Sequence, residues 1–196
     1  MGKLSFGDLG IRDLKECGEL EKRKFEKRFR EVVEPIYGNQ DVFLRKISEG
    51  TDRNARVLYD GKEMVGLLVF KKGLSDERKS YGIREAMEVK TFLIFSDSIK
   101  WKGLHSAFLF REGVEEALKQ GAKSLFATLS EKKEEHMGFF ETIGFEEVAR
   151  LPNLHEEGVH EKLLCIWDLR KSLETLNEFI NNCGKSYTKR REGAFR

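Results

Sequence analysis

The segment Lys-Trp-Lys-Gly-Leu-His-Ser-Ala, residues 100–107, follows a run rich in Val, Thr, Phe and Ile and opens a run with helical apolar spacing that continues to Lys119. This order predicts a strand, a turn and a helix. The first amides of a helix lack intrahelical acceptors, and the helix dipole favours an anion beside them. Gly103 leaves the backbone open to close approach, and Lys100 and Lys102 add positive charge. The segment is therefore typical of a phosphate-binding turn, although an ordinary strand-to-helix turn with solvated lysines has the same local pattern.

The same segment differs from two common nucleotide-binding motifs. It has neither the GxxxxGK[ST] pattern of a Walker loop nor the GxGxxG pattern of a dinucleotide-binding fold. Nucleotide hydrolysis is therefore not expected of this chain.

The elements on either side of the turn indicate the fold class. Upstream, residues 56–70 predict two antiparallel strands joined at Asp60-Gly61, a dipeptide that favours tight hairpins, and residues 86–95 predict a further strand. Downstream, residues 103–119 predict a helix and residues 124–128 predict a strand. A strand, a helix and a strand in this order imply a crossover connection, which makes the two strands parallel.

The flanking segments add further helices. Before the hairpin we expect a short strand at 4–9 and helices at 12–36 and 40–48, because apolar residues recur there at helical spacing. After the crossover, Ser130 can cap a helix that ends at Gly144.

Strands at 146–150 and 162–167 and a last helix at 169–180 complete the pattern. The expected fold is α/β (α+β), with a mixed, mostly antiparallel central sheet flanked by helices. We expect a principal domain at 1–169, followed at 170–196 by a helix and a basic tail that lacks apolar periodicity and is expected to be mobile.

Composition sets outer limits on the class of protein. The 196 residues are 39% hydrophobic and 36% charged, with a formal net charge of +2, so bulk charge indicates no particular partner. The sequence has no apolar run long enough to cross a bilayer and no apolar leader at its start, so we expect a cytoplasmic protein with no membrane partner. Cys17, Cys165 and Cys183 are odd in number and lack metal-ligand spacing, which favours reduced structural thiols and no metal.

Two motifs in this order resemble the GCN5-related N-acetyltransferases (GNATs). In that family the turn has the pattern [Gln/Arg]-x-x-Gly-x-[Gly/Ala] and binds the pyrophosphate of acetyl-CoA through backbone amides. A later helix of the family ends in Phe-Tyr-x-x-x-Gly-Phe. Gly103 matches the turn, and Phe139, Gly144 and Phe145 match the helix end. The resemblance covers residues 56–169 and implies an acyl-CoA fold with an added C-terminal helix, and acetyl-CoA as acyl donor substrate.

The sequence departs from the family pattern at four positions. Lys100 stands where Gln or Arg is usual, and His105 stands where Gly or Ala is usual, which adds a ring beside the pyrophosphate. Phe140 stands where many members have the Tyr that protonates the departing CoA thiolate, and a phenyl ring has no proton to give. Lys133 lies where an Asn is often found early in the same helix.

The resemblance also implies roles for particular residues. Backbone amides near Ile94 and Phe95 are expected to hold the thioester and the pantetheine arm. Glu88 is the expected base for the attacking amine, directly or through a water, although a solvent-facing charge on an alternating strand is an equal alternative. Tyr81 is the phenol expected to replace the missing acid. The remaining residues expected at the cofactor are Lys100, Trp101, Lys102, Gly103, Leu104, His105, Ser106 and Phe140.

Three histidines and one cysteine carry weaker expectations. His136 shares a helical stripe with two Phe residues, which favours a buried core histidine over a catalytic one. His155 and His160 lie in the loop between the last two strands and are expected to be ordinary polar side chains. Cys165, in an apolar strand, is expected to be an inert buried thiol.

Three functions follow from this sequence. The first is acyl transfer from acetyl-CoA to a primary amine by direct attack, which needs a deprotonated amine and a stabilised oxyanion. The second is a catalytically degenerate protein of the same fold that binds CoA or a partner. The third keeps the enzyme and makes the acceptor a protein or tRNA-linked amine, with the basic tail at 183–196 as a docking arm for nucleic acid or an acidic partner. An oligomer is compatible with all three.

Overall fold

A central sheet organises the chain. The computed structural model describes residues 9–14, 17–37, 39, 41–49, 53–61, 63–72, 79–95, 99–154 and 157–194. Among these residues, seven strands form one sheet in the order β1-β2-β3-β4-β5-β7-β6. The strands are β1 (Leu9–Asp13), β2 (Arg53–Asp60), β3 (Glu63–Lys72), β4 (Ala86–Ile94), β5 (Ser124–Ser130), β6 (Glu146–Pro152) and β7 (His160–Ile166). Only β4 and β5 pair in parallel, so the predicted mixed, mostly antiparallel sheet is confirmed.

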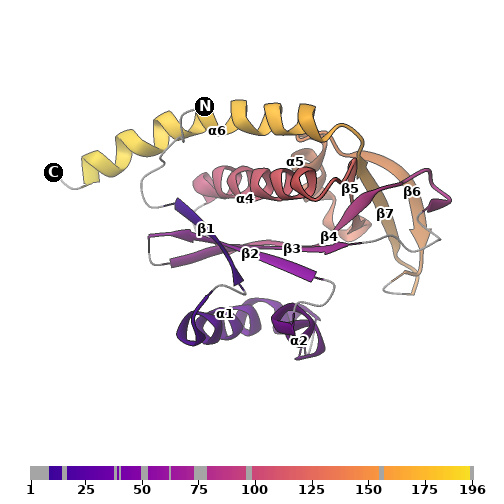
Figure 1. Ribbon diagram of the computed structural model, residues 1–196, viewed down its shortest axis with the longest axis horizontal. Helices are drawn as coiled ribbons and strands as arrows, with labels where there is room; N and C mark the ends of the chain where they lie inside the picture. Colours follow the sequence, from indigo (N-terminus) through magenta and orange to yellow (C-terminus); the bar gives the residue numbers. More distant parts are fainter. Residues whose placement is uncertain are drawn as a thin grey trace.

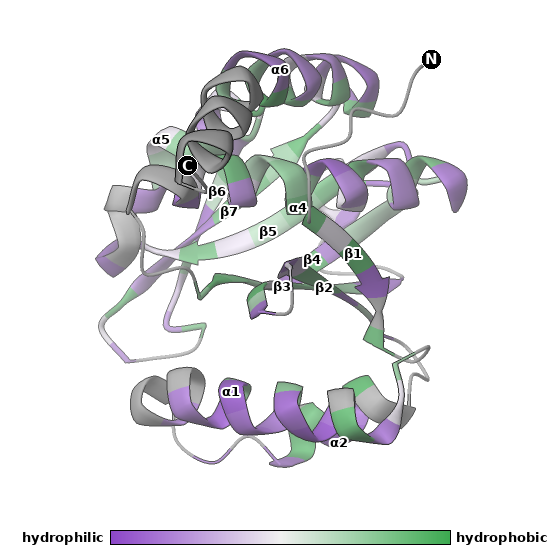
Figure 2. Ribbon diagram, turned by 90° about the vertical axis from the view of Figure 1, so that its left-hand side faces the viewer, coloured by the Kyte–Doolittle hydropathy of each residue, from purple (hydrophilic) through white to green (hydrophobic). Residues whose placement is uncertain are grey.

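Helices cover both faces of the sheet (Figure 1). They are α1 (Glu19–Tyr37), α2 (Asp41–Glu49), α4 (Ile99–Lys119), the 3-10 helix η2 (Glu131–His136), α5 (Met137–Thr142) and α6 (Leu169–Ala194). Helices α1 and α2 lie on one face, α4 and α5 lie on the other, and α6 runs outside α4 (Figures 1 and 2). No helix in the described ranges is long and apolar enough to span a membrane.

The main core lies between the sheet and α4, and α6 closes it from outside. Leu176 and Ile180 of α6 are fully buried in the same cluster as Phe110 of α4. Helix α4 approaches β3 closely at Gly113, where a Cβ would lie 2.3 Å from Cζ of Phe70. A side chain at this position would therefore collide with the core.

Two predicted turns and the crossover are confirmed. Gly61 has φ 63°, the left-handed conformation that a tight hairpin between β2 and β3 requires. Gly144 has φ 97° and ends the helical segment before β6. Strands β4 and β5 are parallel on either side of α4, as the strand-helix-strand order predicts.

The N-terminal prediction is wrong in its boundaries. Residues 1–8, which include most of the strand expected at 4–9, lie outside the described residues. The helix expected at 12–36 begins only at Glu19, because Arg12 and Asp13 belong to β1 and pair with Val57 and Arg56 of β2. The free edge of β2 supplies hydrogen-bond partners that local propensity does not reveal.

The C-terminal prediction is also corrected. Helix α6 does not end near Ile180 but continues through the basic segment to Ala194. Lys, Arg and Glu are strong helix formers, so a polar segment without apolar periodicity can still extend a helix that packing has already nucleated.

Candidate functional site

The sheet divides where β4 and β5 diverge. Ala86–Val89 pair with Ser124–Ala127, but β4 continues to Ile94 and β5 to Ser130 without further pairing between them. We call this region, Lys90–Ile94 of β4 opposite Thr128–Ser130 of β5, the fork. Its position halfway along both strands gives the sheet an internal edge.

A β-bulge accounts for the fork. On β3, Val69 pairs with Thr91 and Phe70 pairs with Val89, which leaves Lys90 as an extra residue in β4. A bulge bends its strand and increases the local twist. Because the last β4–β5 pair is Val89 with Ala127, the bend begins where β4 leaves β5.

Backbone groups of β4 point into the fork. The Phe95 N–H donates to the carbonyl oxygen of Val65 at 2.8 Å, so this amide faces β3. Backbone groups alternate in direction along an antiparallel ladder, so Leu93 also faces β3 whereas Phe92 and Ile94 face the fork. The prediction that the Phe95 amide is available to a ligand is therefore wrong. The backbone of Ile94 faces the fork, as its expected contact with the thioester arm requires. Sequence reasoning missed Phe92, because the alternation can be assigned only once the bulge is located.

An aromatic cluster covers the fork on the α4 side. The rings of Phe92 and Phe139 stack with centroids 5.7 Å apart and planes 10° apart. Phe140 is only 7% exposed and packs edge-on against Phe145 at 5.1 Å and Phe110 at 6.4 Å. Helix α5 therefore brings Phe140 to the fork, but with a ring that carries no hydroxyl.

Helix α4 begins four residues earlier than predicted. Its first residues are Ile99, Lys100 and Trp101, whose N–H groups have no intrahelical acceptor. The exposed Lys102 follows and adds a positive charge near these amides. Gly103 already lies within the helix, so its amide belongs to the helical ladder. The expected phosphate turn is therefore corrected to a helix N-terminus at Ile99, which retains the Lys100 and Trp101 amides as free donors.

The last three residues of the predicted turn also lie within α4. Leu104 is buried in the main core and Ser106 is half-buried. Their amides and that of His105 belong to the helical ladder, so none of the three can donate to a phosphate. Packing of Leu104 in the core is consistent with a helix that begins before Gly103. The local sequence alone fits a turn at these residues equally well.

His105 faces the sheet rather than the start of the helix. Its side chain is 2% exposed and its Nε2 lies 3.7 Å from Oδ2 of Asp60 on β2. Burial lowers the pKa of His105, and the nearby Asp60 charge only partly opposes that shift. Farther along the same two elements, Arg56 and Glu116 form an ion pair at 3.2 Å. His105 thus belongs to the polar contacts between α4 and β2, not to a pyrophosphate site.

Glu88 and Tyr81 lie on the opposite face of the sheet from α5. Met87 and Val89 are buried in the main core on the α4 side, so the intervening Glu88 points the other way. Its side chain is 13% exposed and its Oε1 lies 2.8 Å from Nζ of Lys90. Tyr81 packs against a smaller cluster that includes Phe126, the β5 register partner of Glu88. The sheet separates Tyr81 from Phe140. Tyr81 therefore cannot supply the hydroxyl that is missing at Phe140.

The histidine and cysteine predictions have mixed outcomes. His136 is exposed, so the expected core position is wrong: residues 131–136 wind as a 3-10 helix, which turns His136 away from the apolar stripe. His160 is exposed, with its backbone N–H donating to Oε1 of Glu131 at 3.0 Å, and His155 lies outside the described residues. Cys165 is fully buried, as expected, and burial raises the pKa of its thiol to about 12.

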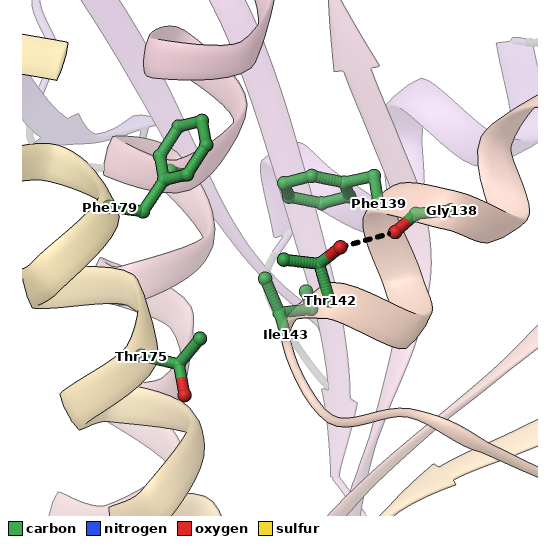
Figure 3. A pocket seen from close by; sticks show the side chains of 7 residues that line it. Gly138, Phe139, Thr142, Ile143, Thr175 and Phe179 are labelled. Atoms are coloured by element: carbon green, nitrogen blue, oxygen red, sulfur yellow. Dashed lines mark hydrogen bonds between the residues drawn. The ribbon is translucent and has the colours of Figure 1, made fainter. Parts of the chain in front are cut away.

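A pocket opens between α4, α5 and α6 (Figure 3). It has a volume of about 210 Å³. Its lining residues are Ala107, Gly138, Phe139, Thr142, Ile143, Thr175 and Phe179. Sequence reasoning missed this pocket, because its walls come from three helices that are far apart in the chain. Within the described ranges, no three His, Cys, Asp or Glu side chains come together in a way that could hold a metal ion.

Comparison with known proteins identifies the fold. No protein-family model and no curated protein sequence matches the chain. Among solved structures, NAA60 of Arabidopsis thaliana in complex with acetyl-CoA matches at a TM-score of 0.66 and 15% identity, over 81% of this chain and 99% of that one. The aminoglycoside 6'-N-acetyltransferase from Enterococcus faecium matches at a TM-score of 0.63 and 15% identity, over 80% and 95%.

A third solved structure is assigned by name to the GNAT acetyltransferases. This protein, from Desulfovibrio desulfuricans, matches at a TM-score of 0.62 and 14% identity, over 81% of this chain and 98% of that one. All three likenesses cover nearly the whole of the matched protein and about four fifths of this chain. The chain therefore has the fold of the GCN5-related N-acetyltransferases.

Proposed function

We propose that this protein transfers an acetyl group from acetyl-CoA to a primary amine. The observation that carries the proposal is the fork, where backbone groups of Phe92 and Ile94 face an internal sheet edge. The start of α4, with its free amides, follows the same strand. The similarly folded NAA60 is bound to acetyl-CoA, which supports the same donor here.

Acetyl-CoA fits these residues in two chemical respects. Its pantetheine arm carries amides that can pair with a strand edge, as an added strand does, and Phe92 and Ile94 offer that edge. Its diphosphate is an anion, which suits the amides of Ile99, Lys100 and Trp101 and the charge of Lys102. The thioester then lies in the fork.

The chemistry divides between the two faces of the sheet. The amine attacks the thioester carbonyl, forming a C–N bond, and the C–S bond breaks as the thiolate leaves. Glu88, on the face away from α5, takes the proton that the amine loses. A backbone N–H directed into the fork, from Phe92 or Ile94, stabilises the oxyanion. Water protonates the departing thiolate, because Phe140 has no proton to give.

Binding and turnover by the unmodified protein test this proposal. Isothermal titration with acetyl-CoA is expected to show one site per chain. Release of free thiol is then measured with a panel of primary amines, and it should depend on both acetyl-CoA and the amine. Absence of acetyl-CoA binding at millimolar concentration would reject the proposal.

A second candidate function is CoA binding without catalysis. Phe140 favours it, because this ring lies in the aromatic cluster at the fork and lacks the hydroxyl that would protonate a thiolate. Acetyl-CoA binding with no thiol release across the amine panel would support this function over the first.

The Phe140→Tyr variant tests whether the missing acid limits the rate. A tyrosine hydroxyl here would lie beside Phe92 at the fork, and a positioned acid typically contributes at least about 100-fold to a rate. We expect kcat for acetyl transfer to rise by about tenfold, the smaller gain reflecting an added hydroxyl in an apolar cluster. Phe139→Tyr, on the neighbouring ring, is the control and should give no such gain. An unchanged kcat in Phe140→Tyr would mean that protonation of the thiolate does not limit the rate.

A further inference from the structure

The pocket between α4, α5 and α6 adjoins the proposed donor site. Phe179 of α6 lies over the first turns of α4, since a Cβ at Gly103 would lie 3.5 Å from Cζ of Phe179. Ala107, one turn farther along α4, forms part of the pocket wall. One helix therefore carries both the free amides at Ile99–Trp101 and a wall of the pocket.

Two aromatic rings stand on opposite walls of the pocket. Phe139 enters from α5 and Phe179 enters from α6, with open space between them (Figure 3). The ring of Phe139 also stacks on Phe92 at the fork. Phe179 is 37% exposed, although it belongs to a helix whose inner residues are fully buried. A flat ring entering the pocket can therefore stack on Phe179 and cover its exposed surface.

The polar atoms of the pocket select among flat rings. The Thr142 hydroxyl donates to the carbonyl oxygen of Gly138 at 2.6 Å (Figure 3). The Thr175 hydroxyl donates to the carbonyl oxygen of Lys171 at 3.1 Å. Each hydroxyl proton is thus used within its own helix, and each oxygen keeps acceptor capacity. The pocket suits an aromatic heterocycle that carries N–H donors and no charge.

We propose that this pocket binds the adenine ring of acyl-CoA, with Phe179 as its stacking partner. The inference rests on the proposed function. With the thioester in the fork and the diphosphate at the start of α4, the nucleoside is the outermost part of the donor, and α6 is the outermost layer of the fold (Figure 1). The volume of about 210 Å³ is below the roughly 300–1,000 Å³ of pockets that enclose a whole small molecule, so it suits one ring system.

The test compares two donors that share the thioester and the pantetheine arm. Isothermal titration measures the affinity of wild type and Phe179→Ala for acetyl-CoA and for S-acetyl-4'-phosphopantetheine, which lacks the 3'-phosphoadenosine and the second phosphate of the diphosphate. Base–aromatic stacking is typically strong enough for Phe179→Ala to weaken acetyl-CoA binding by about tenfold. Binding of the phosphopantetheine donor should change by less than about twofold, because the lost contact is to the adenine alone.

Two further variants control for the fold. Trp167→Ala removes another exposed aromatic residue, 43% exposed, that precedes α6 and does not line the pocket, so it should leave both affinities unchanged. Phe179→Leu keeps apolar volume and removes the ring, so it should show the same selective loss as Phe179→Ala. Thermal melting of each variant checks that α6 remains packed.

The outcomes separate the inference from the function on which it rests. If wild type fails to bind either donor, the proposed function is wrong and the adenine site is rejected with it. If wild type binds acetyl-CoA and the Phe179 variants leave both affinities unchanged, or weaken both equally, the adenine site is rejected and the proposed function stands. A selective loss for acetyl-CoA in both Phe179 variants supports the site.

Discussion

Glu88→Gln is expected to lower kcat for acetyl transfer by about 100-fold, while the KM for acetyl-CoA changes by less than about twofold. The amide keeps the size of the side chain and an oxygen for the contact with Lys90, but it cannot take a proton from the amine. The side chain lies on the face opposite α5, so the donor contacts at the fork are left intact. Steady-state kinetics with acetyl-CoA and the best amine of the panel provide the measurement.

A matched carboxylate separates catalysis from surface charge. Glu147 of β6 also lies in ion pairs, with Arg150 at 2.8 Å and Lys162 at 3.8 Å, and it is remote from the fork in the sheet order. Glu147→Gln should leave kcat unchanged. If Glu88→Gln also retains wild-type kcat, Glu88 is only a paired surface charge on β4, and the amine loses its proton elsewhere.

Gly113→Ala is expected to reduce the free energy of unfolding by about 2 kcal/mol, although alanine favours a helix over glycine by about 1 kcal/mol. The new Cβ would lie 2.3 Å from Cζ of Phe70 and 2.7 Å from Cδ2 of Leu68, both on β3. These two side chains are fully buried, so neither can move without repacking the core. Equilibrium unfolding in urea measures the effect.

A second helical glycine provides the comparison for Gly113. Apart from its chain neighbours and its own helix backbone, no described residue places an atom within 4 Å of where a Cβ of Gly138 in α5 would lie, so Gly138→Ala should be neutral or stabilising. Combining Gly113→Ala with Phe70→Leu should recover part of the lost free energy of unfolding, because leucine lacks the ring atoms that the new Cβ would contact. Full stability of Gly113→Ala alone would show that α4 can shift away from β3 at little cost.

The sequence predicted those elements that depend on neighbouring residues. Asp60-Gly61 placed the hairpin, and the apolar spacing after Gly103 placed the body of α4 between two parallel strands. Such signals are predictive because a tight turn or an amphipathic helix face is determined by a few neighbouring residues.

Features that depend on distant partners escaped prediction. The bulge at Lys90, which determines whether Phe92 or Phe95 turns its amide into the fork, follows from pairing with β3. His105 was expected beside a phosphate, but Asp60 on another strand and the surrounding core hold it inside. From the sequence, Gly113 only lowers helix propensity; its close approach to Phe70 on β3 is evident only in the folded structure. In each case the deciding contact joins segments that no local pattern connects.

The short β4–β5 ladder has a mechanical consequence. Strands β1 to β4 form one half-sheet and β5, β7 and β6 form the other, and in the described part of the chain the ladder between them is limited to the pairing of Ala86–Val89 with Ser124–Ala127. Because no ladder hydrogen bonds cross the sheet beyond that seam, a rotation of one half against the other widens the fork without breaking either half-sheet. The apolar side chains of α4 belong to a core cluster with residues of both halves, so this packing would resist such a rotation. A small rotation at the seam would therefore change the width of the fork without unfolding a sheet edge.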